Sequence, residues 1–260
     1  MIAIVVITHN RLPTLRRCVE DVLLRTSNLT TEIVIWDNGS RDGTAAYVES
    51  LPDPRFRCIR SSTNVGMNGY ARAFRQTKAP YMIELDDDVV AAPWHWDRVL
   101  YEAYRKLPEV GFLAADLAPN PHDQASRVRH EVRPHEYHPY EINGIRLLSG
   151  PAGGGCAMTS RDVADRVGGF PERPGRVFWQ EEWEYIRALE RIGLESAVLA
   201  DLHVLHQSPS GPEPPEKREF WRRYERRQKQ KMALKRLLLR IPLVRPMNRR
   251  FEWFQEPSSR

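Results

Sequence analysis

Apolar runs of strand length alternate with amphipathic stretches over the first ninety residues of the chain. The opening run, IAIVVIT at 2–8, is unbroken and rich in β-branched residues, as is typical of a strand buried on both faces of a sheet. Further runs that predict strands lie at 32–37, 56–61 and 81–88, and the stretches that predict helices lie at 13–25, 42–50 and 66–77. This alternation predicts a parallel, doubly wound sheet with its binding sites at the carboxyl ends of the strands.

The pattern changes after residue 90. A polar and irregular stretch occupies 119–141, and RLLSGPAGGGCAMTS at 146–160 predicts two strands joined by a glycine turn. The other predicted elements are helices at 94–106, 161–167 and 180–192, strands at 111–116 and 196–206, a proline-rich linker at 208–215 and a helical tail from 216. We therefore expect an α/β body at 1–207 and a helical extension at 216–260, separated by the linker.

The composition is that of a globular protein. Of 260 residues, 41% are hydrophobic and 28% are charged, which excludes a collagen-like or wholly disordered chain. No apolar run approaches the roughly 18 to 20 residues that cross a bilayer, and Met1 leads into a strand pattern without the basic segment of a secretory signal. Three widely spaced cysteines fit reduced thiols. We therefore expect a cytoplasmic protein.

Positive charge is concentrated near the C-terminus. Residues 216–254 hold 14 Lys or Arg against 4 Glu, so that, with a net charge of +5 for the chain and a neutral end at 255–260, residues 1–215 carry −5. An acidic body argues against a nucleic-acid partner, whose site would be basic. The basic tail also has an apolar stripe, so it could pack on the body, bind a partner, or lie peripherally on the anionic inner face of a membrane.

Three adjacent carboxylates, Asp86, Asp87 and Asp88, end the strand predicted at 81–88. Adjacent carboxylates repel each other, and a hard divalent cation relieves that repulsion. Mg²⁺ and Mn²⁺ bind through one or two carboxylates together with substrate phosphates. The alternative is a solvated acidic turn, but the position after an unbroken apolar strand favours a metal site.

A second acidic cluster opens the helix predicted at 180–192. The helix dipole alone would favour Glu181, Glu182 and Glu184 in the first turn. The functional alternative is a general base, because a carboxylate beside apolar surface can have a raised pKa and accept a proton. Trp179 and Trp183 flank the cluster and could supply that surface, stack on a sugar ring, or belong to the core.

Polar residues also follow the first two strands. Thr8, Asn10 and Arg11 come after the first strand, where they could bond a base or ribose and neutralise phosphate, and Asp37 ends the second. Adjacent strand ends are where an α/β sheet binds a nucleotide. No G-x-G-x-x-G and no G-x-x-x-x-G-K-[ST] occurs, which excludes dinucleotide-binding and P-loop sites.

The ordered motifs resemble those of the family 2 glycosyltransferases, which have the GT-A fold. The segments that carry the resemblance, within about 2–207, are VVITHNR, IVIWDNGSRDGT, NVGMNGYARA, ELDDD, GGGCAMTSRDVADRVGGFPE and QEEWEYIRALERIG. The resemblance implies a Rossmann-like, mostly parallel sheet flanked by helices. It also implies an inverting transferase that uses a nucleotide-diphosphate sugar and a divalent metal, Mn²⁺ or Mg²⁺.

The resemblance also implies roles for individual residues. Those expected to bind the nucleotide sugar are Thr8, Asn10, Arg11, Asp37, Asn64, Gly66, Arg72, Asp86 and Asp87. Those expected to hold the metal are Asp88, Asp86 and His206, with His203 as an alternative to His206. Those expected beside the acceptor are Gly153, Gly154, Trp179 and Trp183.

The expected general base is Glu182, at the second acid of the family's Glu-Asp pair. Because Glu182 is longer than the usual Asp by one methylene, Glu181 is the alternative base. Glu184 replaces a further Asp, and Ala188 stands where the family often has Arg, so we expect contacts to the diphosphate to be redistributed to nearby arginines or to the tail.

Two rival functions stay open from the sequence. A nucleotidyltransferase that makes sugar nucleotides would need a glycine-rich loop after the first strand, where THNRLP stands instead. A non-catalytic binding protein with a decayed site would use the basic tail. Within 119–141, His122, His130, His135 and His138 match no common zinc spacing, so we expect an acceptor-facing loop there. The sequence leaves the donor sugar, its base and the acceptor open.

Overall fold

The structure is a computed structural model that describes residues 1–118, 137–207 and 215–238. The chain forms two compact units, 1–211 and 212–260, and each is described here by itself. Most of the predicted linker and of the predicted acceptor loop, with His122, His130 and His135, lies outside the described residues. The last residue of the predicted linker, Pro215, is the first residue of helix α7.

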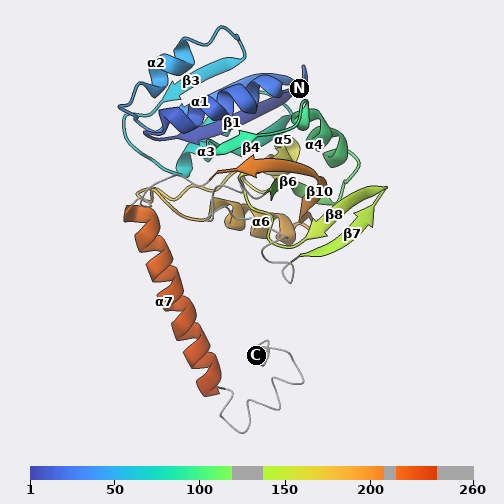
Figure 1. Cartoon of the computed structure of the whole chain (residues 1–260). Coiled ribbons are helices and arrows are strands. Elements are labelled where there is room, and N and C mark those ends of the chain that lie inside the picture. Colours follow the sequence, from blue (N-terminus) through green and yellow to red (C-terminus); the bar gives the residue numbers. More distant parts are fainter. Residues whose placement is uncertain (119–136, 208–214, 239–260) are drawn as a thin grey trace. The chain divides into compact units, whose positions relative to one another are not determined.

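The first half of the sheet is parallel, as the alternating pattern predicts. Its strands lie in the order β3-β2-β1-β4 (Figure 1). Their bounds are Ile2–Thr8 for β1, Thr30–Asp37 for β2, Phe56–Arg60 for β3 and Tyr81–Asp86 for β4. In register, Thr8 lies beside Asp37 on β2, and Ile7 lies beside Asp86 on β4. The polar residues at the ends of three strands therefore meet at one edge of the sheet.

The second half of the sheet is mixed. The order continues β4-β9-β6-β10-β8-β7, and β5 pairs with β10. The bounds are Val89–Ala91 for β5, Val110–Ala118 for β6, His138–Ile142 for β7, Ile145–Ser149 for β8, Cys156–Ser160 for β9 and Glu195–His206 for β10. Strands β9, β8 and β5 run against the strands that they pair with. The other described strands share one direction, so the sheet is mostly parallel, as expected.

Two sequence-based boundaries were wrong. The strand predicted at 81–88 ends at Asp86, and the short strand β5 follows the turn that holds Asp87 and Asp88. The predicted irregular stretch also contains β7, which forms a hairpin with β8. Strand β5 forms through its pairing with β10, which is distant in the sequence, so a local pattern does not reveal it. The β7–β8 hairpin turns at Asn143 and Gly144, a local signal that the sequence-based prediction missed.

Helices cover both faces of the sheet. They are α1 Leu12–Asp21, α2 Thr44–Glu49, α3 Asn68–Phe74, α4 Trp96–Tyr104, α5 Arg161–Arg166 and α6 Glu181–Arg191, with a 3₁₀ turn η1 at Leu23–Arg25. Alternate residues of β1 enter separate apolar clusters, Ile4 with Leu15 of α1 and Val5 with Tyr70 of α3. This is the side-chain period of a strand buried on both faces. It fixes which strand residues face α3 and α6.

The second unit contains helix α7, Pro215–Leu238. It carries aromatic residues near its start, where the Phe220 and Trp221 rings lie 5.3 Å apart. No described helix, α7 included, is long and apolar enough to span a membrane.

Candidate functional site

Two aspartates and a histidine meet where β4 ends. The imidazole Nε2 of His206 lies 2.9 Å from Asp88 Oδ1 and 3.8 Å from Asp86 Oδ2. One ligand atom from each of the three residues lies within 4.8 Å of the others. The antiparallel pairing of β5 with the end of β10 brings His206 to the aspartates, although it is more than a hundred residues away in sequence. The backbone N–H of Gln207 donates to Asp88 O at 2.8 Å.

Electrostatics favour charged forms of this group. Burial would lower the pKa of His206, but the neighbouring carboxylates of Asp86 and Asp88 outweigh burial and raise the pKa to about 10. Burial would raise the pKa of Asp88, but His206 and Arg11 outweigh burial and hold that pKa below its ordinary value. Once a cation displaces the proton of His206, two carboxylates and a neutral imidazole form a donor set that fits a small divalent cation such as Mn²⁺. The residues present therefore suit the expected metal.

Arg11 and Thr8 contact the aspartates. The Arg11 guanidinium lies 2.6 Å from Asp87 Oδ1 and donates to Asp88 Oδ2 at 2.9 Å. The Thr8 hydroxyl donates to Asp87 Oδ2 at 2.7 Å. Burial raises the pKa of Asp87 above its ordinary value, against the opposing charge of Arg11. Thr8 and Arg11 thus fix the aspartate turn, a role that their sequence position did not suggest.

Asp37 ends β2 as a fully buried carboxylate with one open acceptor. Its Oδ1 accepts the backbone N–H of Ser40 at 2.7 Å. Its Oδ2 has no hydrogen-bond partner among the described residues, and the nearest cationic nitrogen is Arg60 Nε at 3.7 Å. Asn10 ties the first loop to the second, since its Oδ1 accepts the Arg41 backbone N–H at 2.8 Å. An orphaned buried oxygen is costly, so Asp37 suits a ligand that donates an N–H or O–H.

The segment that contains Asn64 and Gly66 packs closely against Val177. Gly66 has a φ of +58°, and a Cβ there would lie 1.5 Å from the carbonyl oxygen of Val177. Only glycine fits this contact. Asn64 Oδ1 accepts the Gly66 backbone N–H at 2.8 Å. Arg72, on α3, is paired with Glu172 at 2.8 Å. Asn64 and Arg72 are thus engaged with the chain itself, and the segment is held against 173–177.

The glycine turn at 153–155 lies beside Asp86, one of the candidate metal ligands. The backbone N–H of Asp86 donates to Gly155 O at 2.9 Å. A Cβ on Gly154 would lie only 1.8 Å from Oε1 of Glu84, a residue inside β4 that is 1% exposed. Sequence reasoning missed Glu84, although it is the one charged residue within the otherwise apolar part of YMIELDDD.

The paired glutamates differ in exposure. Glu181, the first residue of α6, is 2% exposed, and its Oε2 has no hydrogen-bond partner among the described residues. Burial raises the pKa of Glu181 well above its ordinary value, and the charges of Glu182 and Glu84 add to that rise. Glu182 is half-buried and so reaches the surface. Glu184 is ion-paired with Arg173.

The two tryptophans are also unlike each other. Trp179 is buried, and the Arg173 guanidinium lies 5.4 Å from the centre of its ring. Trp183 is 40% exposed on α6. Trp183 is therefore the one of the two whose ring is open to a ligand.

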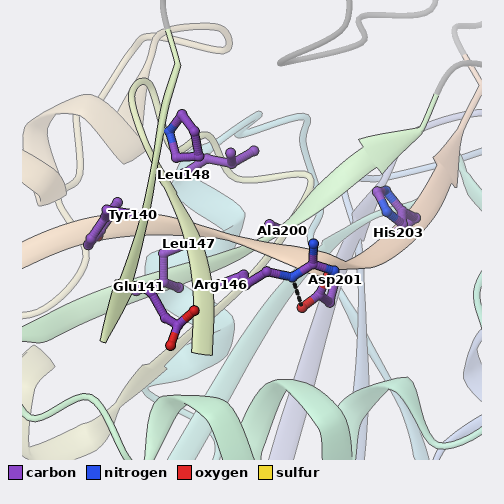
Figure 2. A pocket seen from close by; sticks show the side chains of 9 residues that line it. Tyr140, Glu141, Arg146, Leu147, Leu148, Ala200, Asp201 and His203 are labelled. Atoms are coloured by element: carbon purple, nitrogen blue, oxygen red, sulfur yellow. Dashed lines mark hydrogen bonds and ion pairs between the residues drawn. The ribbon is translucent and has the colours of Figure 1, made fainter. Parts of the chain in front are cut away.

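His203 lies apart from the metal group. Its Nδ1 is 3.3 Å from Asp116 Oδ2 on β6, and it lines a cavity of about 510 Å³ that is bordered by residues of β7, β8 and β10. Figure 2 shows the residues that line this cavity, with Arg146 and Asp201 forming an ion pair among them. None of its lining residues belongs to the group of Asp86, Asp88 and His206. The geometry thus places His206, not His203, beside the aspartates.

Comparison with known proteins supports the sequence resemblance. The family model described as Glycosyl transferase family 2 matches residues 3–168. The succinoglycan biosynthesis protein ExoO of Rhizobium meliloti (strain 1021) is 31% identical over 103 residues, which cover 39% of this chain and 29% of that protein.

Solved structures share the fold. The mannosyltransferase PcManGT from Pyrobaculum calidifontis, solved with GDP-Man and Mn²⁺, matches with a TM-score of 0.57 at 18% identity, over 80% of this chain and 57% of its own. TarS 1–349 from S. aureus, solved with UDP-GlcNAc, matches with a TM-score of 0.59 at 16% identity, over 81% of this chain and 59% of its own. The chain spans less than two thirds of each relative's length. These likenesses confirm the predicted GT-A fold.

Proposed function

The chain belongs to glycosyl transferase family 2, and from that premise we propose that it is a metal-dependent, inverting transferase. It moves a sugar from a nucleotide-diphosphate donor to a hydroxyl or similar nucleophile of an acceptor. The observation that carries this proposal is the convergence of Asp86, Asp88 and His206 on one point at the carboxyl edge of the sheet. ExoO and the two structural relatives, one solved with GDP-Man and Mn²⁺ and one with UDP-GlcNAc, support the donor class.

The residues around the group of Asp86, Asp88 and His206 have different roles in binding a donor. Asp86, Asp88 and His206 would hold a divalent cation, which when bound neutralises the charge that develops on the leaving diphosphate. Arg11 keeps the aspartate turn in place. The open oxygen of Asp37 accepts an N–H of the base or a hydroxyl of the ribose.

Exposure favours Glu182 over Glu181 as the general base, because a base must reach the proton that it removes. Glu182 takes the acceptor's proton as the acceptor oxygen attacks C1 of the sugar from the face opposite the diphosphate. The bond from C1 to the acceptor forms while the bond from C1 to the diphosphate breaks, so the configuration at C1 inverts. Glu181, the first residue of α6, is buried and is the alternative base.

A nucleotide panel tests the proposal. We expect UDP, GDP or dTDP to stabilise the chain only when Mn²⁺ is present. At a hundred times its Kd the ligand adds about 2.7 kcal/mol, which raises the melting temperature of a domain of this size by about 5–10 °C. Differential scanning fluorimetry with Mn²⁺ and with EDTA measures this shift. The proposal fails if no nucleotide shifts the melting temperature, or if EDTA leaves the shift unchanged.

Adding nucleoside triphosphates to the panel and identifying the released product separate the rival functions. A nucleotidyltransferase would be stabilised by a nucleoside triphosphate and would release pyrophosphate, whereas a transferase releases a nucleoside diphosphate from a nucleotide sugar. A non-catalytic binding protein would show the stabilisation without any turnover. The loop THNRLP, which is not glycine-rich, favours the transferase.

We further propose that α7 binds an anionic membrane surface. Residues 215–238 carry 10 Lys or Arg against 3 Glu. Among the apolar residues, Tyr224 is 41% and Leu234 is 55% exposed. Basic helices with exposed aromatic and aliphatic side chains bind such surfaces, with about 1 kcal/mol for each Lys or Arg near the membrane.

Reversing the charge of Arg222, Arg223, Arg226 and Arg227 to Glu is expected to abolish binding to vesicles that contain phosphatidylserine. The change removes the attraction to the lipid surface, and co-sedimentation of the full chain measures it. Replacing the same four residues by Lys is the matched control and is expected to retain binding. Equal binding to neutral phosphatidylcholine vesicles, or displacement of the chain from vesicles by duplex DNA with a preference for the DNA, would contradict the membrane assignment.

A further inference from the structure

A buried carboxylate lies behind the proposed site. Glu84 is 1% exposed and lies in β4 on the face of the sheet that packs against α3 and α6. Its strand neighbour Met82, two residues earlier and on the same face, belongs to the apolar cluster that contains Tyr185 of α6. A carboxylate in such surroundings is costly, and an aliphatic residue would fill the position without that cost. The packing of the core therefore does not explain Glu84.

The carboxylate touches the glycine turn. A Cβ on Gly154 would lie 1.8 Å from Glu84 Oε1. Since a carbon–carbon bond is about 1.5 Å long, this oxygen lies within about 3.3 Å of the Gly154 Cα, a separation typical of Cα–H···O contacts. Position 154 thus has no room for a side chain because Glu84 already fills that space.

The same turn is linked to the candidate metal ligand. Gly155 O accepts the backbone N–H of Asp86 at 2.9 Å, and Asp86 Oδ1 accepts the Tyr70 hydroxyl at 3.0 Å. The Tyr70 hydroxyl also lies 3.0 Å from Leu85 O. Glu84 is therefore next to a connected set of contacts that joins the turn, the end of β4 and α3.

We propose that Glu84 is a positioning residue whose carboxylate fixes the turn of Gly153, Gly154 and Gly155 beside Asp86. The assignment of this turn to the border of donor sugar and acceptor rests on the proposed function. Glu84 touches neither ligand. It sets where the turn lies, and so where the acceptor lies relative to Asp86 and Glu182.

Amide exchange of the full chain tests this role without any substrate. The Asp86 amide donates to the turn, so its exchange rate reports whether the turn stays in place. Glu84→Ala is expected to raise this rate about tenfold, and Glu84→Gln, which has the same shape, is expected to keep it near that of the wild type. Glu102→Gln, at an exposed glutamate of α4, is the control. An unchanged rate in Glu84→Ala, or an equal rise at amides throughout the sheet, would overturn the proposal.

Gly154→Ala gives a second test if Glu84→Ala does not fold. The added methyl would collide with Glu84, so the exchange rate of the Asp86 amide is expected to rise about tenfold. Adding Glu84→Asp to Gly154→Ala is expected to recover part of that loss, since the shorter side chain leaves room for the methyl. Additive effects of the two substitutions would contradict the contact.

Turnover measurements test whether Glu84 affects catalysis separately from donor binding. In Glu84→Ala, kcat is expected to fall at least tenfold, while the affinity for Mn²⁺ with nucleoside diphosphate stays within about twofold, because Asp86, Asp88 and His206 are retained. A loss of affinity with kcat unchanged would overturn the positioning role. If the wild-type chain transferred no sugar, the proposed function would fail, whereas the exchange measurements would still decide the role of Glu84.

Discussion

Replacing Glu182 by Gln is expected to reduce turnover by roughly 10²- to 10⁴-fold, the contribution typical of a positioned general base. The amide keeps the shape of the side chain but does not accept the acceptor's proton. Binding of metal and nucleotide is expected to stay unchanged, because Glu182 is not among the residues that converge with His206. The substrate for this assay is the nucleotide sugar that stabilises the wild-type chain most. The rate is measured as the release of nucleoside diphosphate from that substrate.

Two further variants make this result specific. Glu190→Gln changes an exposed glutamate of the same helix and is expected to retain wild-type turnover. Glu181→Gln distinguishes the two candidates, since a buried glutamate with a raised pKa loses little charge on becoming an amide. Near-normal turnover in Glu182→Gln together with a large loss in Glu181→Gln would move the base to Glu181.

Replacing Asp88 by Asn is expected to remove the Mn²⁺-dependent stabilisation by nucleotides and to lower turnover roughly 10²- to 10³-fold. The substitution removes a charged ligand, and a catalytic metal contributes several kcal/mol to stabilising charge in the transition state. Calorimetric titration with Mn²⁺ and nucleoside diphosphate measures the loss of binding.

A loss of binding in Asp88→Asn could also come from misfolding, because Asp88 is ion-paired with His206 and Arg11. His206→Gln removes the third ligand without deleting an aspartate and is expected to give the same loss of Mn²⁺ binding. Asp201→Asn, at an exposed aspartate of β10 paired with Arg146, is expected to leave it unchanged. Full Mn²⁺ affinity in both Asp88→Asn and His206→Gln would exclude this metal site.

The pattern of apolar and polar residues along the chain predicted those strands whose own residues determine their burial. The strands at 2–8 and 32–37 were predicted within two residues of their observed bounds. A short apolar run rich in β-branched residues is typical of a strand buried on both faces of a sheet. The aspartates at 86–88 were predicted to need a partner, because adjacent carboxylates repel each other, and Arg11 pairs with two of them. The sequence left two histidines open, and only the pairing of β5 with β10 brings His206 to these aspartates.

Contacts between distant segments were not predictable in this way. Thr8 and Arg11 were expected at the nucleotide, and their partners are Asp87 and Asp88, nearly eighty residues later. The significance of Glu84 depends on how closely Gly154 approaches it. Neither spacing nor periodicity encodes such an approach, because it is fixed by how β4 and the turn before β9 pack.

The most direct test of the account is anomalous diffraction from crystals soaked with Mn²⁺ and a nucleoside diphosphate. We expect a manganese peak bonded to Asp88 and His206, with the diphosphate on its open side and the Glu182 carboxylate facing the same space. A peak elsewhere, with the ion pair of Asp88 and His206 intact, would contradict it.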